Sequence, residues 1–138
     1  MLNSPEWAIR VITAEENLAD SCFVVGIAED SNGEGSYFIF QCGLRGPSEQ
    51  NRALGLDSYC ILDQAGGVHF GGMEEVRMDP GKGLYLRFNE AAAESLDLVS
   101  NEILLGFSSN VDVELLGSSL RRVFFYGNPE NFPQVVGF

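Results

Sequence analysis

Apolar residues along this chain follow the two-residue period of β-strands more often than the period of helices. Residues 22–28 form a continuous apolar run rich in β-branched side chains, which is typical of a strand covered on both faces. Asn32-Gly33 suits a hairpin turn after this run. In chain order, the pattern predicts strands at residues 7–13, 22–28, 37–42, 58–63, 68–70, 73–78, 84–88 and 102–107.

Two helices are expected in the C-terminal half. Asn89 is a good N-cap for a short helix at 90–98, where alanines favour helix. Ser109, three residues before Asp112, resembles an N-terminal capping pattern and predicts a longer helix at 111–125. We expect a turn at residues 15–20, an exposed irregular loop at 43–55 and an extended tail at 129–138. The fold class is therefore α+β, a mainly antiparallel β-sheet with two C-terminal helices.

Length and charge narrow the possible partners. A chain of 138 residues, 45% of them hydrophobic, fits a single domain spanning 1–138 that needs no metal or disulfide to fold. Asp and Glu number 20 against 8 Lys and Arg, which gives a net charge of −12. Such a surface repels phosphates, so we expect binding neither to nucleic acid nor to an anionic membrane. It attracts a basic partner, although acidic charge can also serve solubility alone.

The cysteines and the single histidine offer little catalytic equipment. Cys22, Cys42 and Cys60 are an odd number in apolar runs, which suggests reduced, buried thiols. With no visible secretory signal or membrane-spanning run, a cytoplasmic location is expected. His69 would lie nearly opposite Leu62 and diagonal to Cys60 in a hairpin, so a Cys–His dyad is conceivable. Apolar and acidic surroundings would raise the thiol pKa, which favours a structural pair.

Other catalytic motifs are missing from the sequence. No CxxC or HExxH occurs, and the acidic residues lack the spacing of a calcium loop. The glycine-rich stretch 66–72 does not lead from a strand into a helix, so it does not form a phosphate-binding loop. We therefore expect a protein that is not an enzyme and that carries no metal or cofactor.

One segment stands out as a candidate binding surface. The strand at 73–78 carries acidic side chains beside two glycines, where the backbone of a partner could come close. Successive strand residues point to opposite faces, so adjacent glutamates can share one face only at a β-bulge. A solvated edge strand protected by charge is the alternative. The candidate partner-binding residues are Asp63, Gly71, Gly72, Glu74, Glu75 and Asp79.

Several segments together resemble a known family. They are Tyr59-Cys-Ile-Leu-Asp63, Gly66-Gly-Val-His-Phe-Gly-Gly-Met73, Leu84-x-Leu86, Ala91-Ala-Ala-Glu-Ser-Leu96 and Leu120-Arg-Arg-Val-Phe-Phe125. The chain from Tyr37 to Tyr126 resembles the predicted bacterial immunity proteins numbered ten among polymorphic-toxin systems. The most specific part of the likeness is the Tyr-Cys to Gly-Gly stretch.

The resemblance implies a protein that binds and neutralises a cognate toxin encoded beside it. A basic nuclease would suit the acidic balance of this chain. The resemblance supplies no catalytic residue. Two alternatives remain: a small-molecule binding domain with a pocket between helices and sheet, and an uncharacterised hydrolase. The sequence leaves the oligomeric state open.

Overall fold

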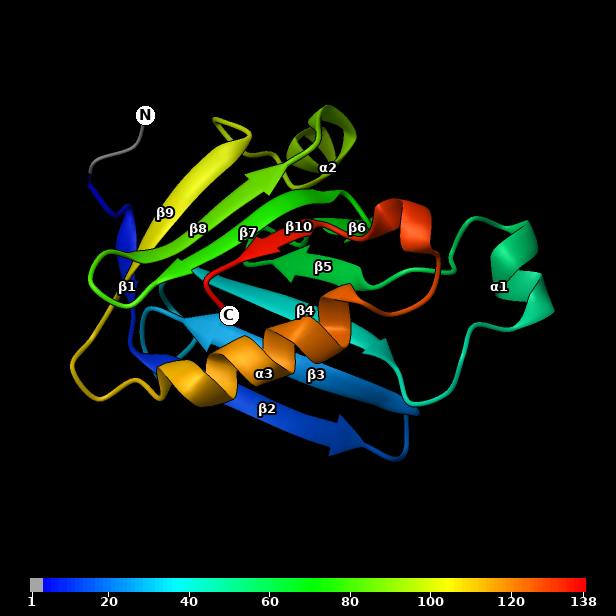
Figure 1. The fold of residues 1–138 in the computed structure, drawn as a ribbon, viewed down its shortest axis with the longest axis horizontal. Coiled ribbons are helices and arrows are strands. Elements are labelled where there is room, and N and C mark those ends of the chain that lie inside the picture. Colours follow the sequence, from blue (N-terminus) through cyan, green and yellow to red (C-terminus); the bar gives the residue numbers. More distant parts are fainter. Residues whose placement is uncertain (1–3) are drawn as a thin grey trace.

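A computed structural model describes residues 4–138 as two β-sheets with a long helix beside them (Figure 1). The helices and the short 3-10 turn are α1 (Glu49–Ala53), α2 (Glu90–Ser95), α3 (Val113–Phe124) and η1 (Pro129–Asn131). The strands are β1 (Trp7–Ile9), β2 (Val11–Asn17), β3 (Cys22–Ala28), β4 (Tyr37–Gly43), β5 (Cys60–Asp63), β6 (Val68–Phe70), β7 (Met73–Asp79), β8 (Gly83–Phe88), β9 (Glu102–Phe107) and β10 (Gln134–Val136).

The strands divide between two five-stranded sheets. Sheet B is an antiparallel meander in which β2 to β6 pair in chain order. Sheet A has the order β1-β9-β8-β7-β10, with antiparallel pairing at its centre and a parallel strand at each edge. The prediction of a mainly antiparallel α+β fold is confirmed, although the strands form two sheets where one was expected.

The core lies between the inner faces of the two sheets. Phe38 and Phe40 of sheet B are buried, and the ring of Phe38 stacks 5.8 Å from that of Phe88 in sheet A. Helix α3 closes the open side of this core, in front of β3 and β4 (Figure 1). Its Phe124 meets Phe40 edge-on at 5.3 Å between ring centroids. Aromatic contacts therefore join all three layers at one place.

The helices expected from the sequence are present but shorter. Asn89 caps α2 as predicted, and its side chain accepts a hydrogen bond from the Ala92 amide. The cap of α3 is Asp112 and not Ser109, because the Asp112 carboxylate accepts from the Leu115 amide at 3.0 Å. No helix within residues 4–138 is long and apolar enough to cross a membrane.

Four local predictions differ from the structure. The strand expected at 7–13 is two strands, since Arg10 separates β1 in sheet A from β2 in sheet B. Strand β2 also runs through the first half of the expected turn at 15–20, and the expected loop at 43–55 contains α1. The tail forms η1 and β10, and β10 pairs with β7.

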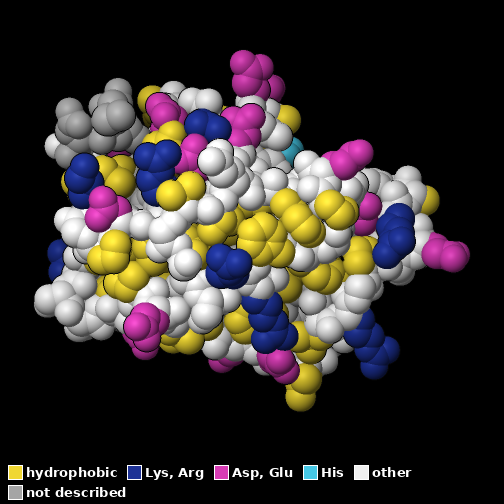
Figure 2. All heavy atoms as spheres, in the orientation of Figure 1, with side chains coloured by type: hydrophobic (Ala, Val, Ile, Leu, Met, Phe, Trp, Pro, Cys, Tyr) yellow, Lys and Arg dark blue, Asp and Glu magenta, His cyan; other side chains and the backbone are white. Residues whose placement is uncertain are grey.

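An exposed apolar band crosses the side of the molecule that carries the C-terminal segment. Figure 2 shows yellow side chains gathered over β10, η1 and the end of α3. Phe125 and Val136 are exposed here, and Phe132 is half-buried. The Phe125 and Phe132 rings lie 5.3 Å apart, and the Arg121 guanidinium stands 5.5 Å from the Phe125 ring. The aromatic side chains of this band therefore pack against neighbours within the chain.

Candidate functional site

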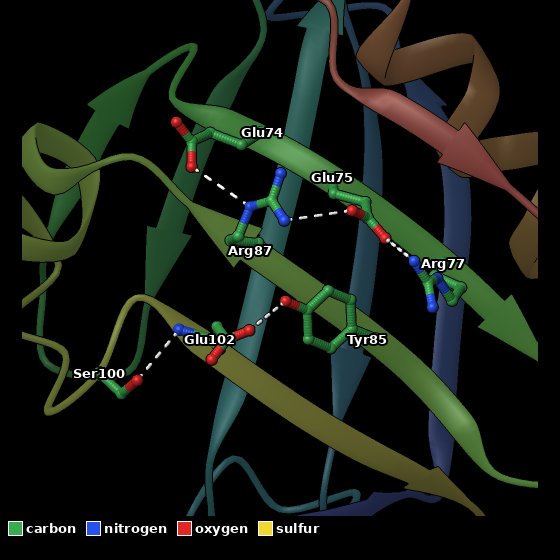
Figure 3. A network of polar contacts seen from close by, with 7 residues as sticks. All are labelled: Glu74, Glu75, Arg77, Tyr85, Arg87, Ser100 and Glu102. Carbon is green, nitrogen blue, oxygen red and sulfur yellow. Dashed lines mark hydrogen bonds and ion pairs between the residues drawn. The ribbon is translucent and has the colours of Figure 1, made fainter. Parts of the chain in front are cut away.

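A β-bulge in β7 brings two neighbouring glutamates to one face of sheet A. Met73 pairs with Phe88 and Glu75 with Arg87, so the register shifts across Glu74. The extra residue cancels the usual alternation. Both carboxylates consequently point to the outer face of the sheet, where Arg87 of β8 lies between them (Figure 3). The sequence had allowed this arrangement only through such a bulge.

The two glutamates differ in how firmly they are held. Glu75 is bound on both sides: its Oε2 lies 2.6 Å from Arg77 Nη2, and its Oε1 lies 3.2 Å from Arg87 Nη1. The side chain of Glu75 is only 7% exposed. Glu74 is 48% exposed and makes one longer contact, 3.4 Å from its Oε1 to Arg87 Nε. Glu75 therefore anchors the two arginines, while Glu74 remains largely in solvent.

The network continues across β8 to β9. The Tyr85 hydroxyl donates a hydrogen bond to the Glu102 carboxylate, and burial together with Glu102 raises the pKa of Tyr85 (Figure 3). The guanidinium of Arg77 lies 5.8 Å from the centre of the Tyr85 ring. The Glu102 amide donates to the Ser100 hydroxyl at 3.2 Å, which fixes the start of β9. The outer face of sheet A is thus a connected polar surface.

A groove of about 270 Å³ runs through this surface, between the side chains of β7, β8 and β9. The face carries four carboxylates, on Glu74, Glu75, Asp79 and Glu102, against three cations, on Arg77, Lys82 and Arg87. Opposite charges are almost balanced here. At this volume the groove is slightly below the usual range of small-molecule pockets, and it lies on the outer face of a sheet and not between the helices and a sheet.

Asp63 lies away from this polar face. It ends β5 in sheet B and is buried. Its Oδ1 accepts hydrogen bonds from the amides of Ala65, at 3.2 Å, and Gly67, at 2.9 Å. Asp63 therefore holds the turn between β5 and β6, as expected of an aspartate at the start of a tight turn.

The two glycines before β7 do allow a close approach, but the approaching groups belong to the chain itself. Gly71 and Gly72 have φ angles of 70° and 92°, which favour glycine. A Cβ on Gly72 would lie 2.6 Å from the Cβ of Ala92 and 2.7 Å from the ring of His69. Gly72 thus permits α2 to pack beside the β6 strand.

Asp79 is the remaining candidate residue from the sequence. It ends β7, and its Oδ1 accepts a hydrogen bond from the Gly81 amide at 3.0 Å. It also lines the groove on the outer face of sheet A. Of the six residues singled out in the sequence, the structure brings together Glu74, Glu75 and Asp79 on this face.

The residues that complete the network were missed. Arg77, Tyr85 and Arg87 occupy outward positions of β7 and β8, and Glu102 begins β9. The strict alternation at 84–88 already placed Tyr85 and Arg87 opposite the inward leucines and phenylalanine. These residues come together because β8 pairs with both β7 and β9, and the hydrophobic pattern of the sequence does not show which strands are neighbours.

Cys60 and His69 do not form a dyad. His69 pairs with Ile61 and not with Leu62, so His69 and Cys60 point to opposite faces of sheet B. Burial raises the pKa of the Cys60 thiol from 9.0 to about 11 and lowers the pKa of His69. His69 Nδ1 instead lies 3.0 Å from the Ser95 hydroxyl of α2. Across residues 4–138, no three His, Cys, Asp or Glu side chains gather as a metal site would require.

A protein-family model matches most of the chain. The family model described as Immunity protein 10 matches residues 8–113, which include all of sheet B and β7 to β9 of sheet A. No curated protein and no solved structure matches the chain.

Proposed function

From the premise that this chain belongs to the immunity protein 10 family, we propose that it binds and neutralises a cognate bacterial toxin by protein–protein interaction. The observation that carries the proposal is the family match over residues 8–113. Neutralisation by binding needs a shaped and charged surface and no catalytic group. That requirement is compatible with a Cys60 thiol of raised pKa and with its separation from His69.

We further propose that the toxin is basic, as a nuclease that binds phosphates would be. The net charge of −12 supports this, because long-range attraction raises the association rate of oppositely charged proteins. The polar face of sheet A contributes little of that charge, since its arginines offset its carboxylates. Glu74 and Asp79 reach solvent and add to the attraction, whereas Asp63, Gly71 and Gly72 serve the fold.

The test uses the toxin domain encoded beside the gene for this chain. Co-expression should restore the growth of cells that make the toxin, and the two purified proteins should form a complex. Association should slow at least about tenfold between low and high salt, because screening weakens the attraction. Failure to protect or to bind would refute the proposal.

A matched variant separates binding from hidden catalysis. Cys60→Ala combined with His69→Ala removes the thiol and the imidazole that a hydrolase reading would require. If protection results from binding alone, the folded double variant still protects. Loss of protection with complex formation unchanged would favour the hydrolase alternative instead.

A further inference from the structure

The outer face of sheet B is apolar where a solvated sheet is usually polar. In β3, the inward residues Phe23, Val25 and Ile27 are buried, while the alternate residues are only half-buried. An antiparallel sheet with one wet face normally carries polar side chains there. The continuous apolar run at 22–28 had predicted a strand covered on both faces. Only one face of β3 is covered in this structure.

The apolar character continues on the neighbouring strands, interrupted by polar outward residues on β2 (Thr13, Glu15 and Asn17) and by Gln41 on β4. Strand pairing places Val24 and Ile39 on the outer side of the two central strands, and Val68 and Phe70 on that of β6. Val68 is 49% exposed and Phe70 is 39% exposed. Among the outward residues of these five strands, Glu15 alone is charged. We call this surface the apolar face; its main side chains are Val11, Val24, Ile39, Leu62, Val68 and Phe70.

A hollow of about 300 Å³ lies on the apolar face, above β2, β3 and β4. Gly26 forms its floor because it has no side chain; a Cβ there would lie 2.7 Å from the Thr13 hydroxyl oxygen. Val11 and Ile39 line its walls, and Asp30 lies at its edge. The hollow is suited to receive a single apolar side chain from another protein, as central anchors of interfaces do.

Within residues 4–138, part of this face is covered, since Cys60, which the pairing also places on it, is buried, but the longest helix packs on the other side. Helix α3 packs on the inner side of sheet B, where the Arg122 guanidinium lies 4.0 Å from the Phe23 ring. Helix α1 lies beside the sheet, in the connection between β4 and β5 (Figure 1). An exposed apolar patch bordered by polar residues is typical of interaction sites.

Acidic residues border the apolar face along β2 and at the end where β3 turns into β4. Glu15 lies on the outer strand β2, and Glu29, Asp30 and Glu34 belong to the connection between β3 and β4. Two copies of this chain placed face to face would bring these carboxylates together, which like charges oppose. The exposed band over β10 and α3 differs, since Arg121 and Arg122 accompany it. A basic partner is therefore attracted to the apolar face and not to that band.

We propose that the apolar face of sheet B is the docking surface for the toxin, and that the toxin presents an apolar centre within a basic rim. This inference rests on the proposed function and adds the location of the interface and the character of the partner. The apolar centre supplies affinity, and the acidic rim accelerates association and sets orientation.

Matched substitutions test the location. Val68→Gln and Ile39→Gln place a polar group within the apolar face, whereas Val99→Gln makes the same kind of change at a fully exposed loop valine. Glu74→Lys with Asp79→Lys reverses charge on the polar face of sheet A. The probe is the purified toxin domain encoded beside the gene, and the readouts are its dissociation constant and protection of growth. Circular dichroism and thermal melting establish that each variant is folded.

We expect Ile39→Gln, beside the hollow, to weaken binding about 30-fold or more, Val68→Gln to weaken it about tenfold, and Val99→Gln to leave it unchanged. Val68 lies on the edge strand β6, so its variant remains informative if Ile39→Gln does not fold. Glu15→Lys should lower the association rate several-fold while leaving dissociation nearly constant.

Three results would overturn the inference. Unchanged toxin binding by folded Val68→Gln would place the interface elsewhere, and loss caused only by the Glu74 and Asp79 reversals would place it on sheet A. A wild-type dimer that Val68→Gln dissociates would identify a second copy as the occupant. In each case a wild-type protein that still binds the toxin leaves the proposed function standing; a wild-type protein that neither binds nor protects refutes that function itself.

Discussion

Tyr59 joins the two sheets through a buried hydroxyl, and its removal should be costly. Tyr59 is fully buried immediately before β5. Its hydroxyl accepts a hydrogen bond from the Met73 amide at 3.0 Å, where β7 begins, and donates to the Asn131 carbonyl at 2.8 Å, in η1. Its ring meets Phe124 of α3 edge-on at 5.1 Å. Tyr59→Phe keeps the ring and removes both hydrogen bonds.

The expected loss follows from these two bonds. Each contributes about 1 kcal/mol net, and a buried polar group that loses its partner adds a desolvation penalty. Tyr59→Phe should therefore lower the free energy of unfolding by about 2–3 kcal/mol. Tyr126→Phe is the matched control: its hydroxyl donates to the Arg45 carbonyl at 2.7 Å near the surface, so its loss should cost less than about 1 kcal/mol.

Urea unfolding measures both variants. Trp7 is the single tryptophan and lies 6.4 Å from Phe38 between ring centroids, so its fluorescence reports on the core between the sheets. The midpoint should fall for Tyr59→Phe while the slope stays constant, because the unfolded chain is little changed. Equal losses for the two variants would contradict the assignment of Tyr59 as a buried connection between the sheets.

Three further outcomes are expected. Burial raises the pKa of Cys42 and Cys60 from 9.0 to about 11, so these thiols lose their protons at lower pH in the unfolded chain than in the folded protein. The free energy of unfolding should therefore fall as pH rises from 9 to 11. Over the same pH range, the urea midpoint should fall less in a variant with both cysteines changed to alanine. Asp63→Ala should lower the free energy of unfolding by about 1–2 kcal/mol and leave toxin affinity of the folded protein unchanged, as calorimetric titration would show. Gly72→Ala should cost more than about 2 kcal/mol in a thermal melt, through its clash with α2 and its positive φ.

The hydrophobic pattern predicted most strands because burial of one face leaves a local, periodic signal. It did not predict which strands become neighbours. Residues 7–13 show one continuous pattern, yet the Ile9 carbonyl accepts from Ser108 beyond β9, while the Arg10 amide donates to Ala28 of β3. The chain therefore changes sheets at Arg10. Both sheets bury side chains in the same core, so the pattern continues across the change.

Register explains the main errors at the candidate site. The sequence placed His69 opposite Leu62, but Leu62 pairs with Val68, a shift of one residue. Such a shift moves every side chain of a strand to the other face. The bulge at Glu74 has the opposite consequence, because it brings two neighbouring side chains together. Both features depend on partner strands and turns, which local periodicity does not encode.

Short elements escaped prediction for another reason. Helix α1 has five residues and none of them is buried, so it lacks an apolar stripe. Strand β10 has three residues and follows Pro133, a signal that usually ends regular structure. Strand β10 is held in the sheet by its backbone pairing with β7, which its own sequence does not signal.

The two sheets place different demands on the order of assembly. Sheet B is built entirely from consecutive strands, so hairpin closure can complete it once the chain reaches Phe70. Sheet A needs β1 to meet β9 and β7 to meet β10, and these contacts close much longer loops. An early intermediate would thus consist of sheet B alone, with both faces bare, and would be prone to aggregation until sheet A and α3 cover one of them.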